Sequence, residues 1–315
     1  MRIDAWKERR LHKRLKTRPA LITSRGFCFT GLEQMIFEEE NPMQISRGDV
    51  GSHVGLIQNR LNRLGALLVE DGHFGGGTVS AVNYACEQLD LPVVSEVDAM
   101  LWEKLNAVKE PSSLLPTRGV TFIAIEEITS RRRYDQAYIH PCWPGEYSGI
   151  TIGIGYDLRF ADKAKFDADW RHWLTKDSYE VLLPWLLKQG SKDGADSLKN
   201  TTQPFIAAWN VFTSRTIPLF VHETQKAFPG YDDLPPLCQS ALVSLVYNRG
   251  AGMNGDRRVE MLTIRSMVAD GKLSDVPSQF EAMKRLWPNT SGLCGRRDRE
   301  ANLWRDGLAK EVVLS

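Results

Sequence analysis

The sequence predicts an α+β protein, mostly α-helical, in which a small three-helix bundle precedes a larger domain with one β-hairpin or small sheet. Apolar residues recur at helical spacing over most of the chain from residue 51 onward. Only residues 149–158 alternate small and β-branched residues as a hairpin does. Two prolines and two serines in residues 108–117 (VKEPSSLLPT) predict a linker between the two parts.

The bulk composition is that of a globular protein, with 315 residues, 42% hydrophobic and 25% charged. The net charge of +1 hides an asymmetry, because residues 1–18 carry eight Lys and Arg against two acidic residues. We expect this basic arm to be a solvated terminus, although its charge also suits an anionic polymer. The acidic run Glu38–Glu40, followed by Asn41-Pro42, indicates a boundary, and residues 1–46 are assigned to an N-terminal extension.

Several classes of protein are disfavoured by what the sequence lacks. No apolar stretch reaches the roughly 20 residues of a membrane-spanning helix, and no apolar segment follows the N-terminal charges as in a signal peptide. The five cysteines lack Cys-x-x-Cys spacing, so we expect buried thiols, with a disulfide left open. His53 and His73 have no third ligand at a suitable spacing. We expect no integral membrane segment, no metal and no cofactor.

Residues 47–107 predict three short helices around a small core. The first helix has one apolar face and ends at Gly65. A glycine-rich turn, DGHFGGGT, follows, and Thr78 at its end is expected to cap the second helix. The residues expected to point inward are Val54, Ile57, Leu61, Leu64, Ala81, Val82, Ala85, Val97, Leu101 and Leu105.

Three motifs run through this module. They are Gly51-x-x-Val54-x-x-Ile57-Gln58-x-x-Leu61, then Asp71-Gly72-x-Phe74-Gly75-x-x-Thr78-x-x-Ala81-Val82, then Leu101-Trp102-x-x-Leu105. With these motifs the module resembles the common peptidoglycan-binding three-helix domain. It departs from that family at Ala85-Cys86, where an aromatic residue and Gln are usual. The resemblance implies that peptidoglycan is a partner of the chain.

The larger domain, residues 118–315, begins with an apolar helix that ends in Glu126 and Glu127. A carboxyl group beside an apolar face is partly desolvated, so we expect the pKa of Glu127 to be raised toward neutral. That is the state a general acid needs. Glu126 is expected to be an exposed residue at the helix end.

The run Ser148–Leu158 (SGITIGIGYDL) lies about two dozen residues after Glu127. Its glycines would let the backbone approach a substrate, and Thr151 would offer a hydroxyl group. The same glycines would equally serve a structural turn, and the pattern alone favours neither interpretation.

Glu127-Ile128-Thr129-Ser130 and Thr151-Ile152-Gly153-Ile154-Gly155 resemble the phage-type lysozyme (endolysin, muramidase) family. In that family the catalytic Glu ends the first helix and a Thr-Ile-Gly-x-Gly hairpin follows. Tyr134, Pro141-x-Trp143-Pro144-Gly145 and Gly155-Tyr156-Asp157-Leu158 are similar to a branch with an enlarged loop before the hairpin. Two later stretches are similar to the buried helix and the closing helix of the family. They are Leu237–Gly252, which contains Tyr247-Asn248-Arg249-Gly250, and Gly292-Leu293-x-Gly295-Arg296-Arg297-x-x-Glu300.

The resemblance implies that Glu127 is the general acid and that Thr151 helps to hold the attacking water. The better-known branch has an Asp shortly before the hairpin Thr and a His where Tyr156 stands. Here the nearest acid is Glu146, five residues before Thr151, so Glu146 is a candidate second catalytic residue. The residues expected to bind substrate are Ser148, Gly153, Tyr156, Asp157, Asn248 and Arg296.

Asp157 and Arg296 also have structural interpretations, and the neighbouring Arg297 shares that of Arg296. Asp157 is a second acidic candidate, but it could equally brace the hairpin. Arg296 and Arg297 could pair with Glu127 or Glu126, although surface ion pairs are the commoner outcome for such arginines.

The expected function is hydrolysis of the β-1,4 bond between N-acetylmuramic acid and N-acetylglucosamine in peptidoglycan. Two alternatives stay open: a lytic transglycosylase that uses a single Glu, and a non-catalytic peptidoglycan-binding protein with the same fold. We expect a monomer with no nucleic-acid partner, made in the cytoplasm without a signal peptide. It would reach the periplasmic cell wall through a holin-like pore or a secretion machinery, as a viral endolysin or as a bacterial effector.

Overall fold

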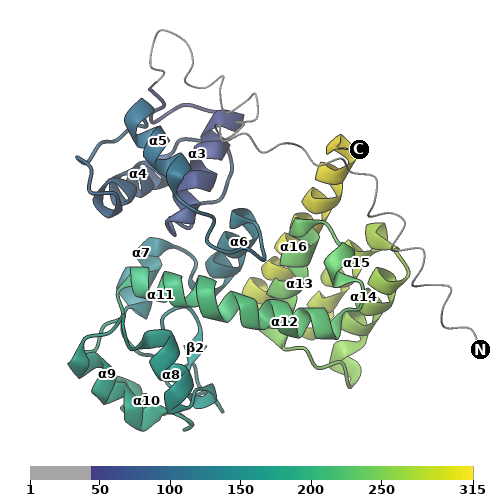
Figure 1. Cartoon of the computed structure of the whole chain (residues 1–315). Coiled ribbons are helices and arrows are strands. Elements are labelled where there is room, and N and C mark those ends of the chain that lie inside the picture. Colours follow the sequence, from purple (N-terminus) through teal and green to yellow (C-terminus); the bar gives the residue numbers. More distant parts are fainter. Residues whose placement is uncertain (1–43, 315) are drawn as a thin grey trace, which may run out of the picture. The chain divides into compact units, whose positions relative to one another are not determined.

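The computed structural model describes residues 44–314, with side chains up to residue 309. These residues belong to one compact unit that runs from Pro42 to Ser315. Helices dominate the described part and one two-stranded sheet is present in it (Figure 1), so the prediction of a mostly helical α+β fold is confirmed. The basic arm at residues 1–18 lies outside the described residues.

The small module has the three predicted helices, α3 (Ser52–Arg63), α4 (Gly76–Gln88) and α5 (Ala99–Ala107). Three of the predicted inward residues of α3 are completely buried, namely Val54, Ile57 and Leu61. The side chain of Asp98 caps α5 by accepting a hydrogen bond from the backbone N–H of Leu101. Helical spacing of apolar residues therefore predicted this part correctly.

Two details of the module differ from the prediction. Thr78 does not cap α4, because the helix begins at Gly76 and no side chain caps its N-terminus. Thr78 is instead buried in the first turn, where Gln58 donates a hydrogen bond to it. Val97 is buried as expected, but it pairs with Ile45 in an isolated β-bridge and lies before α5.

The module is packed on α11 (Phe205–Val211) of the larger domain. The indole N–H of Trp209 donates a hydrogen bond to the carbonyl oxygen of Arg63 at 3.3 Å. Gly65 has a φ of +80°, and a Cβ there would lie 2.7 Å from the ring of Phe205. Leu67 is buried in the hydrophobic core of the larger domain. The two parts therefore share a packed, apolar contact.

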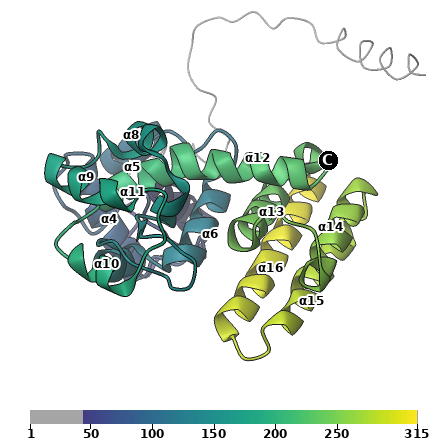
Figure 2. The ribbon, with the colours of Figure 1, turned by 90° about the horizontal axis from the view of Figure 1, so that it is seen from below.

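The larger domain begins with α6 (Thr117–Ile128) and α7 (Arg131–Arg133). The helices that follow are α8 (Lys163–Trp170), α9 (Lys176–Leu182), α10 (Lys192–Ser197), α11, α12 (Ile217–Ala227), α13 (Pro236–Arg249), α14 (Val259–Ala269), α15 (Val276–Ala282) and α16 (Ser291–Leu314). Tyr134–Tyr138 and Phe212–Thr216 are short π-helical segments. The short 3-10 segments are Leu158–Phe160, Leu183–Trp185, Tyr231–Asp233, Asp256–Arg258, Leu273–Asp275 and Met283–Leu286. Figure 2 shows α12 running from the group that contains α8–α11 to the bundle of α13–α16.

Helix α13 lies in the core of this bundle, in contact with α6, α12 and α16. Between Leu237 and Val246 every residue except Gln239 is buried, as expected for a helix surrounded by others. It ends where Gly250 adopts a φ of +73° and its N–H bonds to the carbonyl oxygen of Val246 at 2.7 Å. The predicted apolar helix with a glycine at its C-terminus is confirmed.

The predicted hairpin is present, with strands shorter than the predicted run. Strands β1 (Thr151–Ile152) and β2 (Tyr156–Asp157) are antiparallel, with Thr151 opposite Asp157 and Ile152 opposite Tyr156. Cys142 forms an isolated bridge to Thr151 on the other edge of β1. Because side chains alternate along a strand, Ile152 and Tyr156 share the buried face and Thr151 and Asp157 share the other.

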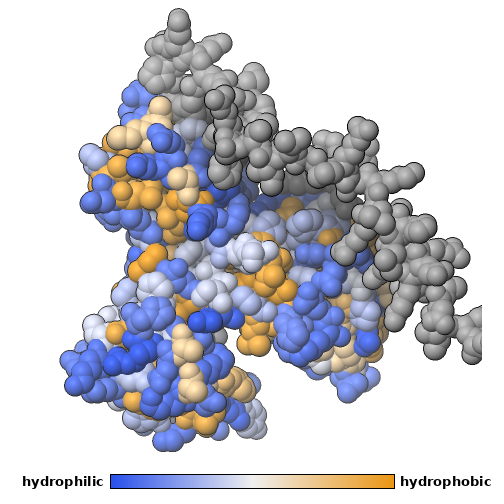
Figure 3. All heavy atoms as spheres, viewed as in Figure 1, coloured by the Kyte–Doolittle hydropathy of each residue, from blue (hydrophilic) through white to orange (hydrophobic). Residues whose placement is uncertain are grey.

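The face of the molecule in Figure 3 is mainly hydrophilic, with apolar residues in scattered patches. Over residues 44–314 no helix is both long and apolar enough to cross a membrane. Among the cysteines within this range, Cys86, Cys142 and Cys294 are free thiols, and the Cys238 Sγ donates a hydrogen bond to the carbonyl oxygen of Trp304 at 3.3 Å.

Candidate active site

Glu127 lies in the last turn of α6, where the helix ends at Ile128. The helix stops because Thr129 adopts a left-handed φ of 68°, which its N–H stabilises by bonding to the carbonyl oxygen of Ile125. One face of α6 is buried in the core through Val120, Ile123 and Ala124. The Glu127 side chain keeps 22% of its surface exposed. The helix therefore presents this carboxylate, half-buried, at a solvent-accessible edge.

A buried arginine holds Glu127. Arg296 of α16 donates from Nη1 to Glu127 Oε1 at 2.8 Å. Its Nη2 donates to the carbonyl oxygen and to the hydroxyl of Ser244 on α13, both at 3.1 Å, and its Nε donates to Glu300 at 3.2 Å. Burial alone would lower the pKa of Arg296, but the carboxylates of Glu300 and Glu127 outweigh it and raise that pKa above its usual range.

Of the pairings that the sequence left open, that of Arg296 with Glu127 is present, whereas the surroundings of Glu126 differ from the prediction. Glu127 is in contact with a guanidinium group and not only with apolar residues. Glu126 was expected to be exposed, yet its side chain is only 4% exposed and forms an ion pair with Arg299 on α16. The expectation of surface ion pairs for Arg296 and Arg297 is wrong, since both side chains are buried. Helix α16 covers this end of α6, which the local sequence of α6 does not indicate.

A buried ionic network continues behind Arg296. Glu300 is fully buried, accepts hydrogen bonds from Ser244, Arg296 and Arg297, and has its pKa raised because desolvation outweighs the two arginines. Arg297 also donates to the side-chain oxygen of Asn248 at 3.1 Å. These contacts fix the relative positions of α13 and α16 beneath Glu127.

Tyr247 connects this network to the hairpin. Its hydroxyl donates to the carbonyl oxygen of Ile154, in the hairpin turn, at 3.1 Å. Burial raises the pKa of Tyr247 well above its usual value, and the negative charge of Glu127 raises it further, while Arg296 opposes the shift. Tyr247 therefore bonds α13, the helix that carries Ser244 of the network, to the hairpin turn.

The glycines of the hairpin turn face the protein interior. Gly153 has a φ of +59°, and a Cβ there would lie 2.8 Å from the ring of Trp170. Gly155 has a φ of +70°, and a Cβ there would collide with the Tyr247 hydroxyl. Tight packing and positive φ therefore explain why both positions are glycine. Thr151, on the opposite face of the hairpin from Ile152, is only partly buried.

Asp157 uses its carboxylate within the hairpin. Oδ2 accepts from the N–H of Gly149 at 3.1 Å, and Oδ1 accepts from the N–H of Arg159 at 2.8 Å. These bonds hold the start of the hairpin and cap the 3-10 turn Leu158–Phe160. The bracing interpretation of Asp157 matches these contacts.

Glu146 and Ser148 lie on the loop before the hairpin. Glu146 is exposed with a φ of +49°, and its carboxylate makes no hydrogen bond or ion pair with another residue of the described range. The loop is held through its backbone, because Gln189 donates to the carbonyl oxygen of Glu146 and Trp143 donates to that of Ser148. The Glu146 side chain is therefore accessible, and no partner in the described range fixes it.

Tyr156, predicted to bind substrate, points into the core. Its ring packs edge-on against Trp170 at 5.6 Å, and its hydroxyl donates to Asp169 at 2.9 Å. The side chain is 7% exposed. Burial, followed by the nearby Asp169 carboxylate, raises the pKa of the Tyr156 hydroxyl. Its position is that of a residue that supports the hairpin from behind.

Asn248 is exposed and lines a cavity of ≈ 680 Å³ together with Arg249, Arg258 and Trp287. The two arginines brace the surrounding loop, because Arg249 donates to the carbonyl oxygen of Arg257 and Arg258 donates to that of Arg249. Burial and the neighbouring arginines lower the pKa of Arg249 to about 10. This basic cavity adjoins the network that holds Glu127 through the contact of Arg297 with Asn248.

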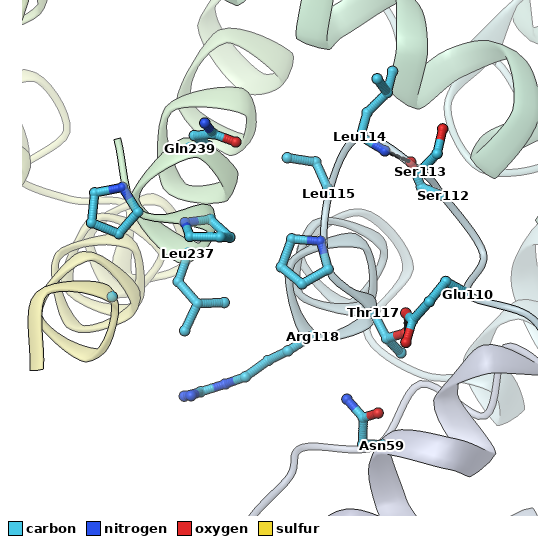
Figure 4. A pocket seen from close by; sticks show the side chains of 14 residues that line it. Asn59, Glu110, Ser112, Ser113, Leu114, Leu115, Thr117, Arg118, Leu237 and Gln239 are labelled. Atoms are coloured by element: carbon cyan, nitrogen blue, oxygen red, sulfur yellow. Dashed lines mark hydrogen bonds between the residues drawn. The ribbon is translucent and has the colours of Figure 1, made fainter. Parts of the chain in front are cut away.

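A further cavity, of ≈ 670 Å³, lies at the other end of α6 (Figure 4). Leu237 and Gln239 of α13 lie on one side of it and Leu114 and Leu115 of the linker on the other. Its charged groups are already paired, Arg118 with Asp306 and Glu110 with Arg63. Since α6 is 12 residues long, this cavity is about 15 Å from Glu127. It offers no free acid for catalysis.

Within the described range no group of three His, Cys, Asp or Glu residues could hold a metal ion. No family model matches this chain, and no curated protein matches its sequence. The function is therefore inferred from the geometry around Glu127.

Three residues of this site were not predicted to have a role: Ser244, Tyr247 and Glu300. Glu300 lies four residues after Arg296, a spacing that places both on one helical face. That spacing could have indicated the buried pair. The contacts of Ser244 and Tyr247 join segments distant in sequence, so no local pattern indicated them.

Proposed function

We propose that this chain is a peptidoglycan hydrolase with a lysozyme-like larger domain, in which Glu127 acts as general acid. The observation that carries the proposal is the unequal environment of the two Glu127 oxygens. Oε1 is held by Arg296, whereas Oε2 has no hydrogen-bond partner among the described residues and the side chain is partly exposed. A carboxyl group that is held at one oxygen, unbonded at the other and partly exposed suits proton transfer to a bound glycosidic oxygen.

In this mechanism Glu127 donates its proton to the oxygen between N-acetylmuramic acid and N-acetylglucosamine as the β-1,4 bond breaks. The hydroxyl of Thr151 orients the attacking water from the hairpin, whose turn is bonded to Tyr247 of α13. Ser148 and Asn248 are proposed to offer further polar groups to the substrate. Arg296, Tyr156, Gly153 and Asp157 act as positioning residues, because their contacts are with the protein.

A second candidate, lytic transglycosylase chemistry, is favoured by the state of the other carboxylates. Asp157 is engaged by backbone amides, and Glu146 is exposed on a loop without a partner to fix it. A single Glu would then act first as acid and then as base, and the muramic 6-hydroxyl would replace water. A third candidate is a non-catalytic wall-binding protein with the same fold.

The test compares wild type with Glu127→Gln on purified bacterial sacculi. We expect the rate of turbidity loss to fall by about 10²- to 10⁴-fold, the usual contribution of a general acid. Glu126→Gln is the matched control, because Glu126 is the adjacent acid but is paired with Arg299. Equal rates for wild type and Glu127→Gln would contradict the proposal.

Mass spectrometry of the products separates the two enzymatic candidates. Hydrolysis leaves reducing N-acetylmuramic ends, and transglycosylation leaves anhydro ends. Binding to sacculi without any loss of turbidity would support the non-catalytic candidate. In the hydrolytic case we propose that the protein acts on the periplasmic cell wall, with its small module binding peptidoglycan.

A further inference from the structure

A cavity of ≈ 760 Å³ lies between the small module and the segment that follows Glu127. The module contributes residues 66–68 and part of α4, and the larger domain contributes Ser130, Arg131, Arg132, Asp135 and Gln136. Figure 1 shows α7 next to α4. Glu127, Arg296, Tyr247 and Thr151 do not line this cavity, so it is separate from the proposed catalytic centre.

The floor of the cavity is apolar. Ala66, Leu67 and Ala81 are buried beneath it. Tyr84 forms part of the wall, and the Arg131 guanidinium lies between its ring and that of Phe205, 4.4 and 4.2 Å from the centroids. Small apolar groups such as methyls would lose contact with water on this floor.

The rim of the cavity is polar and carries positive charge. Arg131 is engaged by Asp135 at 3.1 Å, but Arg132 is exposed and makes no ion pair with any residue in the described range. Gly76 lies at the start of α4, whose N-terminus no side chain caps, and a Cβ there would meet nothing within 4 Å. A guanidinium and open backbone amides on one rim favour a ligand with carboxylates.

We propose that this cavity binds the peptide stem of peptidoglycan, with alanine methyl groups on the apolar floor and stem carboxylates toward Arg132. The inference rests on the proposed function, since it assigns a second contact of the same substrate. The small module then completes the substrate site in addition to anchoring the protein to the wall.

The spacing along the chain permits both contacts at once. Ser130 follows Glu127 by three residues, so their Cα atoms are at most about 11 Å apart. A four-residue stem spans up to about 14 Å when extended. A stem attached to a muramic acid next to Glu127 is therefore long enough to reach the cavity.

The experiment measures binding of soluble murein fragments to the full chain in a Glu127→Gln background, which prevents turnover. Three probes are used: a disaccharide–tetrapeptide with free carboxylates, the same fragment with amidated carboxylates, and the peptide-free disaccharide. Arg132→Gln tests the rim and Ser80→Trp fills the cavity. Arg133→Gln is the matched control, because Arg133 is exposed on the same turn but does not line the cavity.

We expect Arg132→Gln to weaken binding of the free-carboxylate fragment about five- to tenfold, as for loss of one exposed charge-assisted hydrogen bond. Ser80→Trp should weaken binding of this fragment at least as much, whereas Arg133→Gln should leave it unchanged. The affinity for the peptide-free disaccharide should be the same in all variants. Equal binding by Arg132→Gln and Arg133→Gln, or no preference for free carboxylates, would overturn the proposal. The two proposals fail separately. If the protein with Glu127 intact cleaves no glycosidic bond, the proposed function is contradicted, while the binding measurements still test the cavity.

Discussion

The two helix-end acids differ in their partners, although they are adjacent in sequence. Glu127 is held by the buried Arg296, whose remaining nitrogens bond to α13 and to Glu300. Glu126 is paired with Arg299, a residue that is half-exposed. An anchored guanidinium restricts the orientation of its carboxylate more than a mobile surface side chain does.

This difference predicts the effect of Arg296→Lys on activity. A lysine keeps the charge but cannot donate to Glu127, Ser244 and Glu300 in a planar fork, so we expect kcat to fall about 10²-fold with little change in KM. Arg299→Lys is the control, since it alters the contact of Glu126 in the same way. Steady-state kinetics on soluble glycan fragments check this, and equal losses in both variants would contradict it.

At the scale of elements, α13 and α16 are joined by a buried charge network as well as by apolar packing. Glu300 is the acidic centre of that network, between Arg296 and Arg297. A buried ion pair contributes little net stability, but removal of one partner leaves an uncompensated charge in the core. The interface between these helices therefore depends on Glu300 being present.

Glu300→Ala is expected to lower the free energy of unfolding by about 3 to 5 kcal/mol, because two buried guanidiniums lose their carboxylate. The control is Glu281→Ala, which breaks the exposed pair with Arg305 on the surface of the same bundle and should cost under about 1 kcal/mol. Urea unfolding measures both values. A loss for Glu300→Ala as small as that for Glu281→Ala would contradict the assignment.

At the scale of the whole molecule, the small module and the larger domain are in direct contact and not only joined by residues 108–117. Trp209 donates to the carbonyl oxygen of Arg63, and Gly65 lies against Phe205. A cavity with residues from both parts lies beside this contact. The module is therefore held close to the segment that follows Glu127.

Gly65→Ala is expected to weaken this contact, because its φ is +80° and the new methyl group would lie 2.7 Å from Phe205. Gly48→Ala is the control, since Gly48 also has a positive φ but no atom within 4 Å of the added Cβ. Limited proteolysis should cut residues 108–116 faster in Gly65→Ala than in Gly48→Ala. Identical rates would show that the contact does not protect the linker.

The sequence predicted those elements that local spacing controls. The helices from Ser52 to Arg63 and from Pro236 to Arg249 have apolar positions at regular intervals, and both are present. The pair of Arg296 with Glu127 was one option that the sequence left open. The burial of Arg296 and the pairing of Glu126 with Arg299 were not predicted, because both arginines are about 170 residues away in the sequence. The inward orientation of Tyr156 depends on Asp169 and Trp170, which no pattern within the hairpin specifies.

Leu67 belongs by chain position to the small module and by packing to the core of the larger domain, and it adopts a φ of +56°. A chimera that joined the larger domain to a module from another protein at the linker would lose this leucine. The cavity left in the core would resemble that of a Leu→Ala substitution, which lowers the free energy of unfolding by about 2 to 5 kcal/mol. Exchange of the small module for another therefore requires that residues 65–68 be kept in place against the core of the larger domain.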